Sequence, residues 1–91
     1  MIPGLHVVCY DTSSDARRRR FVGLLSRRGR RVQYSVFELL LDAARLRRLT
    51  RQLAELMEDD DSILIYATSS TRLCLGRDVP ALDEQPRTQV I

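Results

Sequence analysis

Short apolar runs alternate with two amphipathic stretches along this chain. Residues 5–11 form a β-branched and aromatic run that ends on a carboxylate, and its scarcity of polar positions predicts a strand covered on both faces. Residues 30–41 are rich in strand formers and long for one strand, so we expect a hairpin that breaks near residues 34–35. Residues 63–66 predict a second buried strand, and residues 73–75 predict a short edge strand.

Two stretches carry the 3.6-residue period of amphipathic helices. The first covers residues 15–28, begins in a run of capping residues and ends at Gly29, which we expect just beyond the helix C-terminus. Its core stripe consists of Phe21, Val22, Leu24 and Leu25. The second covers residues 42–58, is capped by Asp42 and has the clearest period in the chain. Its apolar face consists of Ala43, Leu46, Leu49, Leu53, Leu56 and Met57.

The resulting order, β-α-β-β-α-β, predicts the ferredoxin-like plan of the α+β class. In this plan an antiparallel four-stranded sheet carries both helices on one face, here with an extra C-terminal strand. Ninety-one residues allow one small domain, which we place at residues 1–79, followed by a proline-marked tail at residues 80–91. Because so small a core is marginal alone, we expect a homodimer in which the terminal strand pairs with another sheet, as in a swap onto the partner.

Charge is distributed unevenly along the sequence, although the net charge is only +3. Residues 15–31 contain eight arginines and one aspartate, whereas residues 52–61 contain five acids and no base. A basic face beside an acidic corner favours a polyanionic partner, which we interpret as nucleic acid. The alternative, that the arginines only form a solvated surface, stays open at this stage.

Several kinds of site lack the residues that they need. His6 is the only histidine and lies within the first predicted strand, so we expect it to be packed rather than catalytic. Cys9 and Cys74 lack the spacing of metal ligands, and the four glycines form no phosphate-binding loop. We find neither a signal peptide nor an apolar run long enough to cross a bilayer, and therefore expect a cytoplasmic protein.

Asp11 is the main candidate for chemistry, because it lies where a buried strand leaves the sheet. A hard cation such as Mg²⁺ takes oxygen ligands, commonly one or two carboxylates with water and phosphate. A two-fold axis near the strand tip brings two copies of Asp11 together, and nearby arginines suit phosphodiester hydrolysis. The simpler alternative is a turn or cap residue.

Three segments resemble the Cas-two family of CRISPR-associated proteins. They are Tyr10-Asp11, the basic helix start at Arg17 to Arg20, and above all residues 31–38, which read Arg-Val-Gln-Tyr-Ser-Val-Phe-Glu. The resemblance extends from about residue 5 to residue 66 in order, spacing and length. It implies a small ferredoxin-like homodimer of prokaryotic spacer adaptation that binds DNA or RNA and works with the Cas-one integrase.

The resemblance also implies roles for single residues. Asp11 matches the metal-ligating carboxylate that faces its mate across the dimer, with Mg²⁺ or another divalent cation as the cofactor, and Tyr10 flanks it. Positions implicated in nuclease activity or substrate contact are matched by Arg18, Arg20, Arg31 and Phe37. We add Arg17 to the nucleic-acid-binding set and Ser35 to the supporting residues. For Phe37 a core position, and for Ser35 a turn position, are the alternatives.

Two questions of function stay open in the sequence. Some members of this family are described as metal-dependent nucleases on RNA or double-stranded DNA, whereas in others the dimer is a structural bridge between integrase dimers. A different class of protein with this fold is a non-enzymatic RNA-binding module, but the aromatic motif on which that module stacks bases is not present here. A toxin-like regulatory dimer is the third alternative.

Overall fold

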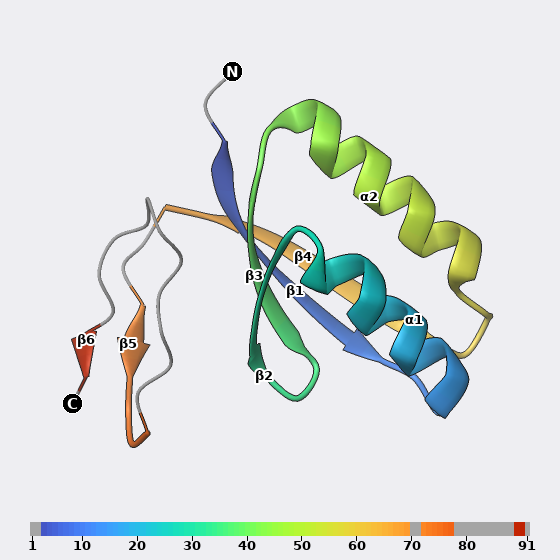
Figure 1. The fold of residues 1–91 in the computed structure, drawn as a ribbon, viewed down its shortest axis with the longest axis horizontal. Helices are drawn as coiled ribbons and strands as arrows, with labels where there is room; N and C mark the ends of the chain where they lie inside the picture. Colours follow the sequence, from blue (N-terminus) through green and yellow to red (C-terminus); the bar gives the residue numbers. More distant parts are fainter. Residues whose placement is uncertain (1–2, 70–71, 78–88, 91) are drawn as a thin grey trace.

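A computed structural model of the 91-residue chain describes residues 3–69, 72–77 and 89–90. Figure 1 shows the elements in chain order. They are β1 (Gly4–Asp11), α1 (Asp15–Ser26), β2 (Gly29–Gln33), β3 (Val36–Leu41), α2 (Ala43–Leu56), β4 (Ser62–Thr68), β5 (Leu73–Cys74) and β6 (Gln89–Val90).

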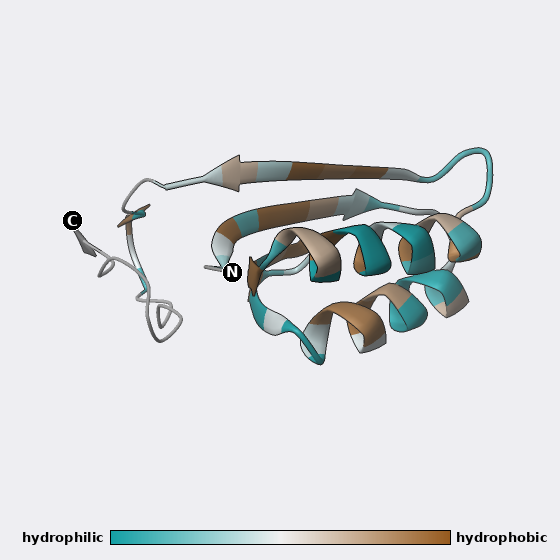
Figure 2. Cartoon of the chain, turned by 90° about the horizontal axis from the view of Figure 1, so that it is seen from above, coloured by the Kyte–Doolittle hydropathy of each residue, from teal (hydrophilic) through white to brown (hydrophobic). Residues whose placement is uncertain are grey.

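The main sheet has four strands in the order β2-β3-β1-β4, and each neighbouring pair is antiparallel. Seen from above in Figure 2, α1 and α2 lie side by side on one face of this sheet. This arrangement confirms the predicted ferredoxin-like α+β fold. The hairpin between β2 and β3 turns at Tyr34 and Ser35, where the sequence places the break.

Side-chain caps start both helices, as their sequences predict. The hydroxyl of Ser14 accepts a hydrogen bond from the backbone N–H of Arg17 at 3.2 Å, and Asp42 Oδ1 accepts one from the N–H of Arg45 at 2.8 Å. Each cap satisfies one of the backbone donors that the first helical turn leaves without a partner. Both helices end two residues earlier than expected, at Ser26 and Leu56.

Gly29 has a different role from the one expected of it. It is the first residue of β2 rather than a residue that ends α1, and its φ is not positive. A Cβ atom at this position would lie 2.2 Å from the carbonyl oxygen of Glu38 and 2.7 Å from a side-chain carbon of Leu39. Glycine is therefore needed here because β2 approaches β3 too closely for any side chain.

The core fills the space between the helices and the sheet. Its buried members come from four elements, β1, α1, β3 and α2, and are Val8, Tyr10, Phe21, Leu25, Phe37, Leu39, Leu41, Leu49 and Leu53. Val22, Leu24, Leu46, Leu56 and Met57 pack against this cluster from the helices and remain partly exposed. Ala43, which we assigned to the apolar face of the second helix, is exposed because it is the first residue of α2.

The other face of the sheet, here called the open face, has no helix over it. Leu5, Val7 and Cys9 alternate with the buried positions of β1 and are only half-buried. On β4, Leu64 and Tyr66 are 52% and 57% exposed. The prediction that these strands are covered on both faces is therefore wrong for a single chain, because both helices pack on the same side.

The segment after β4 reaches back to the inner strand β3, on which Glu38 stands opposite Val7 of β1. Arg72 Nε lies 3.2 Å from Glu38 Oε2, an ion pair in which the carboxylate is largely buried. The strand at residues 73–75 is present as β5, but it pairs with β6 in parallel and forms a separate two-stranded sheet. Residues 78–88 and 91 lie outside the described residues, so the boundary at residue 79 and the swapped tail stay predictions. Within the described ranges, neither helix is long and apolar enough to cross a membrane.

Candidate nucleic-acid interface

Asp11 is the last residue of β1 and stands opposite Ser62 of β4. Because side chains alternate along a strand, Asp11 belongs to the same face as Val7 and Cys9, which is the open face. Its side chain is exposed, and no hydrogen bond or ion pair joins it to another described residue. The carboxylate is thus available to bind a cation from solvent.

The described residues include no group of three or more acidic, histidine or cysteine side chains that could hold a metal ion. Asp11 of a single chain therefore supplies one carboxylate at most, which fits a Mg²⁺ site completed by water, phosphate or a second chain. His6 is buried in β1, with Nδ1 3.0 Å from the carbonyl oxygen of Gly4, as expected of a packed histidine.

Arg18 is held next to the tip of β1. Its Nη2 donates a hydrogen bond at 2.8 Å to the carbonyl of Thr12, the residue that follows Asp11. Its Nη1 forms an ion pair with Asp15, one helical turn earlier on α1. The first turn of α1 therefore brings a guanidinium group to the end of the strand that carries Asp11.

Arg31 of β2 and Arg18 of α1 contact the same residue, Tyr34, in the turn between β2 and β3. The backbone carbonyl of Tyr34 accepts hydrogen bonds from Arg31 Nε at 2.9 Å and from the Tyr10 hydroxyl at 3.1 Å. The guanidinium carbons of Arg18 and Arg31 lie 5.6 Å and 5.1 Å from the centre of the Tyr34 ring. Both distances are within the range of cation–π attraction. We call Arg18, Arg31 and Tyr34 the arginine–tyrosine cluster.

The other aromatic candidates support this cluster from the core. Tyr10 and Phe37 are 5% and 0% exposed, and the Tyr10 ring contacts the rings of Phe21 and Phe37 at centroid distances of 5.6 Å and 6.4 Å. Ser35 accepts a hydrogen bond on its carbonyl from the N–H of Tyr10 at 3.1 Å. Their placement gives these three residues a packing role, and the roles implied by the family resemblance stay predictions.

Arg17 lies at the edge of the interface and is occupied by acidic partners. Its Nε and Nη2 donate to the two oxygens of Asp61 at 2.6 Å and 3.2 Å, and Asp60 is 3.5 Å away. The Arg17 hydrogen bond, aided by donors from the Glu58 backbone and Thr12, lowers the pKa of Asp61 to about 2. This geometry ties α1 to the loop before β4, whereas phosphate binding by Arg17 stays a prediction.

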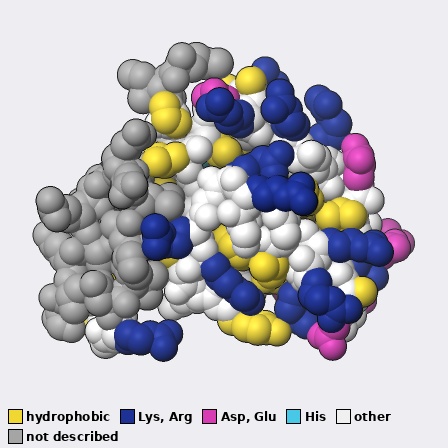
Figure 3. Space-filling model, viewed as in Figure 1, with side chains coloured by type: hydrophobic (Ala, Val, Ile, Leu, Met, Phe, Trp, Pro, Cys, Tyr) yellow, Lys and Arg dark blue, Asp and Glu magenta, His cyan; other side chains and the backbone are white. Residues whose placement is uncertain are grey.

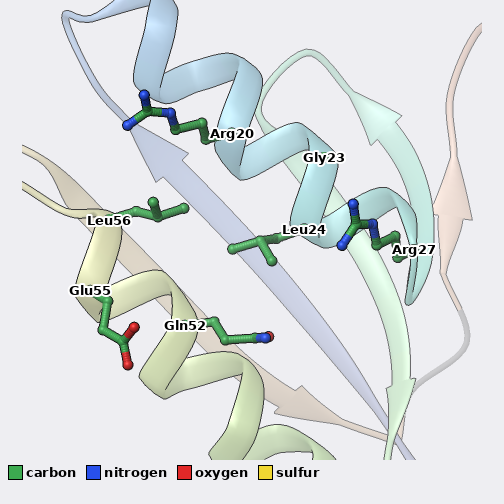
Figure 4. Close-up of a pocket in the computed structure, with 7 residues that line it drawn as sticks. All are labelled: Arg20, Gly23, Leu24, Arg27, Gln52, Glu55 and Leu56. Carbon is green, nitrogen blue, oxygen red and sulfur yellow. The ribbon is translucent and has the colours of Figure 1, made fainter.

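Arg20 belongs to another part of the surface. With Gly23 and Leu24 of α1, Arg27 directly after α1 and three residues of α2, it lines a groove of about 410 Å³ between the helices (Figure 4). No hydrogen bond, ion pair or ring contact joins Arg20 to the arginine–tyrosine cluster within the part of the chain that the structure describes. The predicted nucleic-acid-binding residues therefore do not form one group, because only Arg18 and Arg31 share a partner, Tyr34.

Arginine side chains are spread over the face that α1 and α2 present in Figure 3. Most of these guanidinium groups are exposed, including those of Arg19, Arg20, Arg47, Arg48 and Arg51. A positive surface of this kind attracts polyanions through phosphate contacts that do not depend on base sequence.

Sequence reasoning missed two residues that organise the interface, Tyr34 and Thr12. Tyr34 was noted as part of a turn and of the segment that resembles the family, without a role of its own. Its ring contacts two arginines, and its carbonyl accepts a hydrogen bond from Tyr10, 24 positions earlier. The signal that could have found it is its position beside Arg31 in a turn that the hairpin brings to the tip of β1. The contact of Thr12 with Arg18 uses the backbone carbonyl of Thr12, which carries no sequence signal.

Comparison with known proteins agrees with this geometry. The family model of CRISPR associated protein Cas2 matches residues 4–73. A Synechocystis sp. protein named CRISPR-associated endoribonuclease Cas2 3 is 37% identical over 70 residues, which cover 76% of each chain. A Thermus thermophilus protein named CRISPR-associated endonuclease Cas2 2 is 38% identical over 88 residues, or 96% of each chain.

Solved structures give the same result. A hypothetical protein from Thermus thermophilus superposes with a TM-score of 0.74 and 33% identity, covering 88% of this chain and 93% of that one. A chain from a partial Cas6-RT-Cas1--Cas2 complex superposes with a TM-score of 0.63 and 28% identity, covering 70% and 77%. The match to the family model spans the whole main sheet and both helices, and it confirms the resemblance found in the sequence. This chain belongs to the CRISPR associated protein Cas2 family.

Proposed function

We propose that this chain forms a cytoplasmic homodimer that binds nucleic-acid backbone and acts with the Cas1 integrase in spacer acquisition, with Mg²⁺-dependent endonuclease activity. Membership in the Cas2 family and a structural relative solved in a complex that contains Cas1 support the adaptation role. Relatives named endoribonuclease and endonuclease support the nuclease. The observation that carries the proposal is an exposed Asp11, without a partner among the described residues, followed directly by Thr12, whose carbonyl binds Arg18 of the arginine–tyrosine cluster.

The open face is the surface that suits a second copy of the chain. Leu64 and Tyr66 are more than half exposed on it, although apolar strand faces are ordinarily buried in soluble proteins. Asp11 lies on the same face, so a two-fold axis over the tips of β1 and β4 would bring two Asp11 carboxylates together. A homodimer would thus bury the apolar surface and complete the acidic site in one step.

Asp11 is the residue of this chain that would hold Mg²⁺, and its exposed carboxylate fits such a ligand. A bound divalent ion supplies an activated water and offsets charge on the scissile phosphate. Arg18 and Arg31 would hold and orient the phosphate through charge-assisted hydrogen bonds. These contacts involve only the backbone, so the same site would accept RNA or DNA.

Asp11→Asn tests this proposal, because it keeps the shape of the side chain and removes its charge. We expect the variant to lose Mg²⁺-dependent cleavage of RNA or double-stranded DNA while keeping the fold and the dimer. Wild type is expected to gain thermal stability on addition of Mg²⁺, and Asp11→Asn is not, since ligand binding to the native state alone raises stability. Asp59→Asn, at an exposed site in the loop before β4, is the matched control.

The possible outcomes separate the enzyme from its alternatives. Cleavage that persists in Asp11→Asn would contradict a catalytic role for Asp11. A Mg²⁺ shift in wild type without any cleavage would support a structural bridge between Cas1 dimers instead of a nuclease. Binding of duplexes without a Mg²⁺ shift or cleavage would favour a non-enzymatic nucleic-acid-binding dimer.

A further inference from the structure

The ring of Tyr34 contacts Arg18 of α1 and Arg31 of β2, and neither the family comparison nor the sequence gives this ring a role. We propose that Tyr34 is a positioning residue that holds Arg18 and Arg31 together as one cationic pair for neighbouring phosphates beside Asp11. This inference rests on the proposed binding of nucleic-acid backbone and adds the residue that orders the phosphate-binding groups.

The two arginines come from two consecutive elements of the chain. Arg18 belongs to the first turn of α1, and Arg31 belongs to β2, the edge strand of the sheet. Their guanidinium carbons lie 5.6 Å and 5.1 Å from the centre of the same aromatic ring. The separation of the two charges therefore cannot exceed the sum of these distances. Without the ring, each arginine would keep its own backbone partner, but no shared contact would oppose the repulsion between the two like charges.

The ring contributes little to the core. Tyr34 is 68% exposed, whereas Tyr10 is buried. An exposed ring gains little from burial, and its attractive contacts in the structure are those with Arg18 and Arg31. Replacement of the ring should therefore alter the arginines more than the fold.

Contact with the ring leaves hydrogen-bond donors for a phosphate. A guanidinium group has five N–H donors that lie in its plane, whereas the ring attracts it through its face. Arg31 directs its Nε and one terminal nitrogen to the carbonyl of Tyr34, so its other N–H groups remain for a ligand. Arg18 donates hydrogen bonds to Thr12 and Asp15, and a phosphate can replace Asp15 because its carboxylate is exposed.

Substitutions at position 34 separate the ring from the backbone. Every variant keeps the residue 34 carbonyl, so the bonds from Arg31 and Tyr10 can persist. We expect Tyr34→Leu to weaken binding of a labelled DNA duplex roughly three- to ten-fold, as two exposed cation–π contacts would predict. Tyr34→Phe keeps the aromatic face and is expected to stay within about two-fold of wild type.

A double-mutant cycle identifies the route by which the ring acts. In an Arg18→Ala, Arg31→Ala background, measured at low salt where residual binding persists, Tyr34→Leu is expected to have no further effect. An equal loss in that background would overturn the proposal, because the ring would then contact the nucleic acid directly. Wild-type binding by Tyr34→Leu alone would also overturn it. If the Arg18→Ala, Arg31→Ala variant binds the duplex like wild type, the proposed binding of nucleic-acid backbone by these arginines is wrong, rather than the role of Tyr34 alone.

Discussion

Arg17 and Asp61 form a two-pronged ion pair, in which Nε and Nη2 lie 2.6 Å and 3.2 Å from the two carboxylate oxygens. The carboxylate is fully buried, and it also accepts the N–H of Glu58 at 3.0 Å. One buried acid therefore joins the start of α1 to the loop between α2 and β4. This ion pair fixes the basic turn from which Arg18 reaches Thr12.

Stability at low pH is expected to depend on Asp61. Its pKa falls from the usual 3.8 to about 2 in the folded chain, chiefly through the Arg17 hydrogen bond. A lowered pKa stabilises the fold above the unfolded value and loses that contribution as the pH falls through the folded value. We expect Asp61→Asn to unfold more easily at neutral pH, with its deficit relative to wild type shrinking between about pH 4 and pH 2.

Chemical denaturation across this pH range, followed by circular dichroism, measures the effect. Asp60→Asn is the matched control, because Asp60 is 68% exposed and lies 3.5 Å from the same arginine. We expect this control to stay within about 0.5 kcal/mol of wild type at neutral pH. A deficit of Asp61→Asn that does not change with pH would contradict the proposed ionic origin.

Gly29 and Gly23 offer opposite tests of backbone packing. Alanine at position 29 would place Cβ 2.2 Å from the Glu38 carbonyl oxygen, so we expect a loss of about 2–3 kcal/mol in the free energy of unfolding. Alanine at position 23, within α1, meets no atom within 4 Å and is expected to gain about 0.5–1 kcal/mol. Urea unfolding of both variants tests the pair, and equal effects would contradict this account.

The elements were predictable because their signals are local. The caps at Ser14 and Asp42 and the turn at residues 34–35 each depend on neighbouring residues, and the structure has all three where the sequence places them. Asp11 was predictable as a strand-tip acid for the same reason. What a local pattern cannot show is which of two apolar faces the helices will cover.

The features of the interface that the sequence did not predict depend on contacts between residues far apart in the chain. Arg17 and Asp61 are 44 residues apart, and Tyr10 and Tyr34 are 24 apart. A run of four arginines gives no indication that the first is paired with a buried acid and the second with a strand tip. Arg20 was grouped with them through the family resemblance, whereas the helix turns it into the groove between α1 and α2.

Leu64→Arg is expected to prevent dimerisation if the open face is the dimer interface. Leu64 is 52% exposed in the single chain, and a charge there would be buried without a partner in the dimer. Light scattering of wild type at micromolar concentration is expected to report twice the chain mass, and the variant one chain mass. Ala54→Arg, at an exposed position of α2, adds the same charge and is expected to remain dimeric. A dimeric Leu64→Arg would place the interface elsewhere.

Asp15→Asn is expected to strengthen nucleic-acid binding. The Asp15 carboxylate is 82% exposed and pairs with Arg18, so it competes with phosphate for the same guanidinium group. Exposed pairs of this kind are worth little to the fold, and we expect a stability change within about 0.5 kcal/mol. Removal of the competing charge is expected to tighten duplex binding about two- to five-fold at low salt, as the loss of one exposed ion pair predicts.

Asp42→Asn controls for the change in net charge. Asp42 also pairs with an arginine three residues later, Arg45 at the start of α2, and asparagine there can still cap the helix. Both variants add one unit of positive charge to the chain, so a general electrostatic effect would tighten binding equally in both. Fluorescence anisotropy titrations with unrelated duplexes distinguish these cases. A gain confined to Asp15→Asn indicates that phosphate binds at Arg18, whereas equal gains would remove the evidence for a defined phosphate site at the tip of β1.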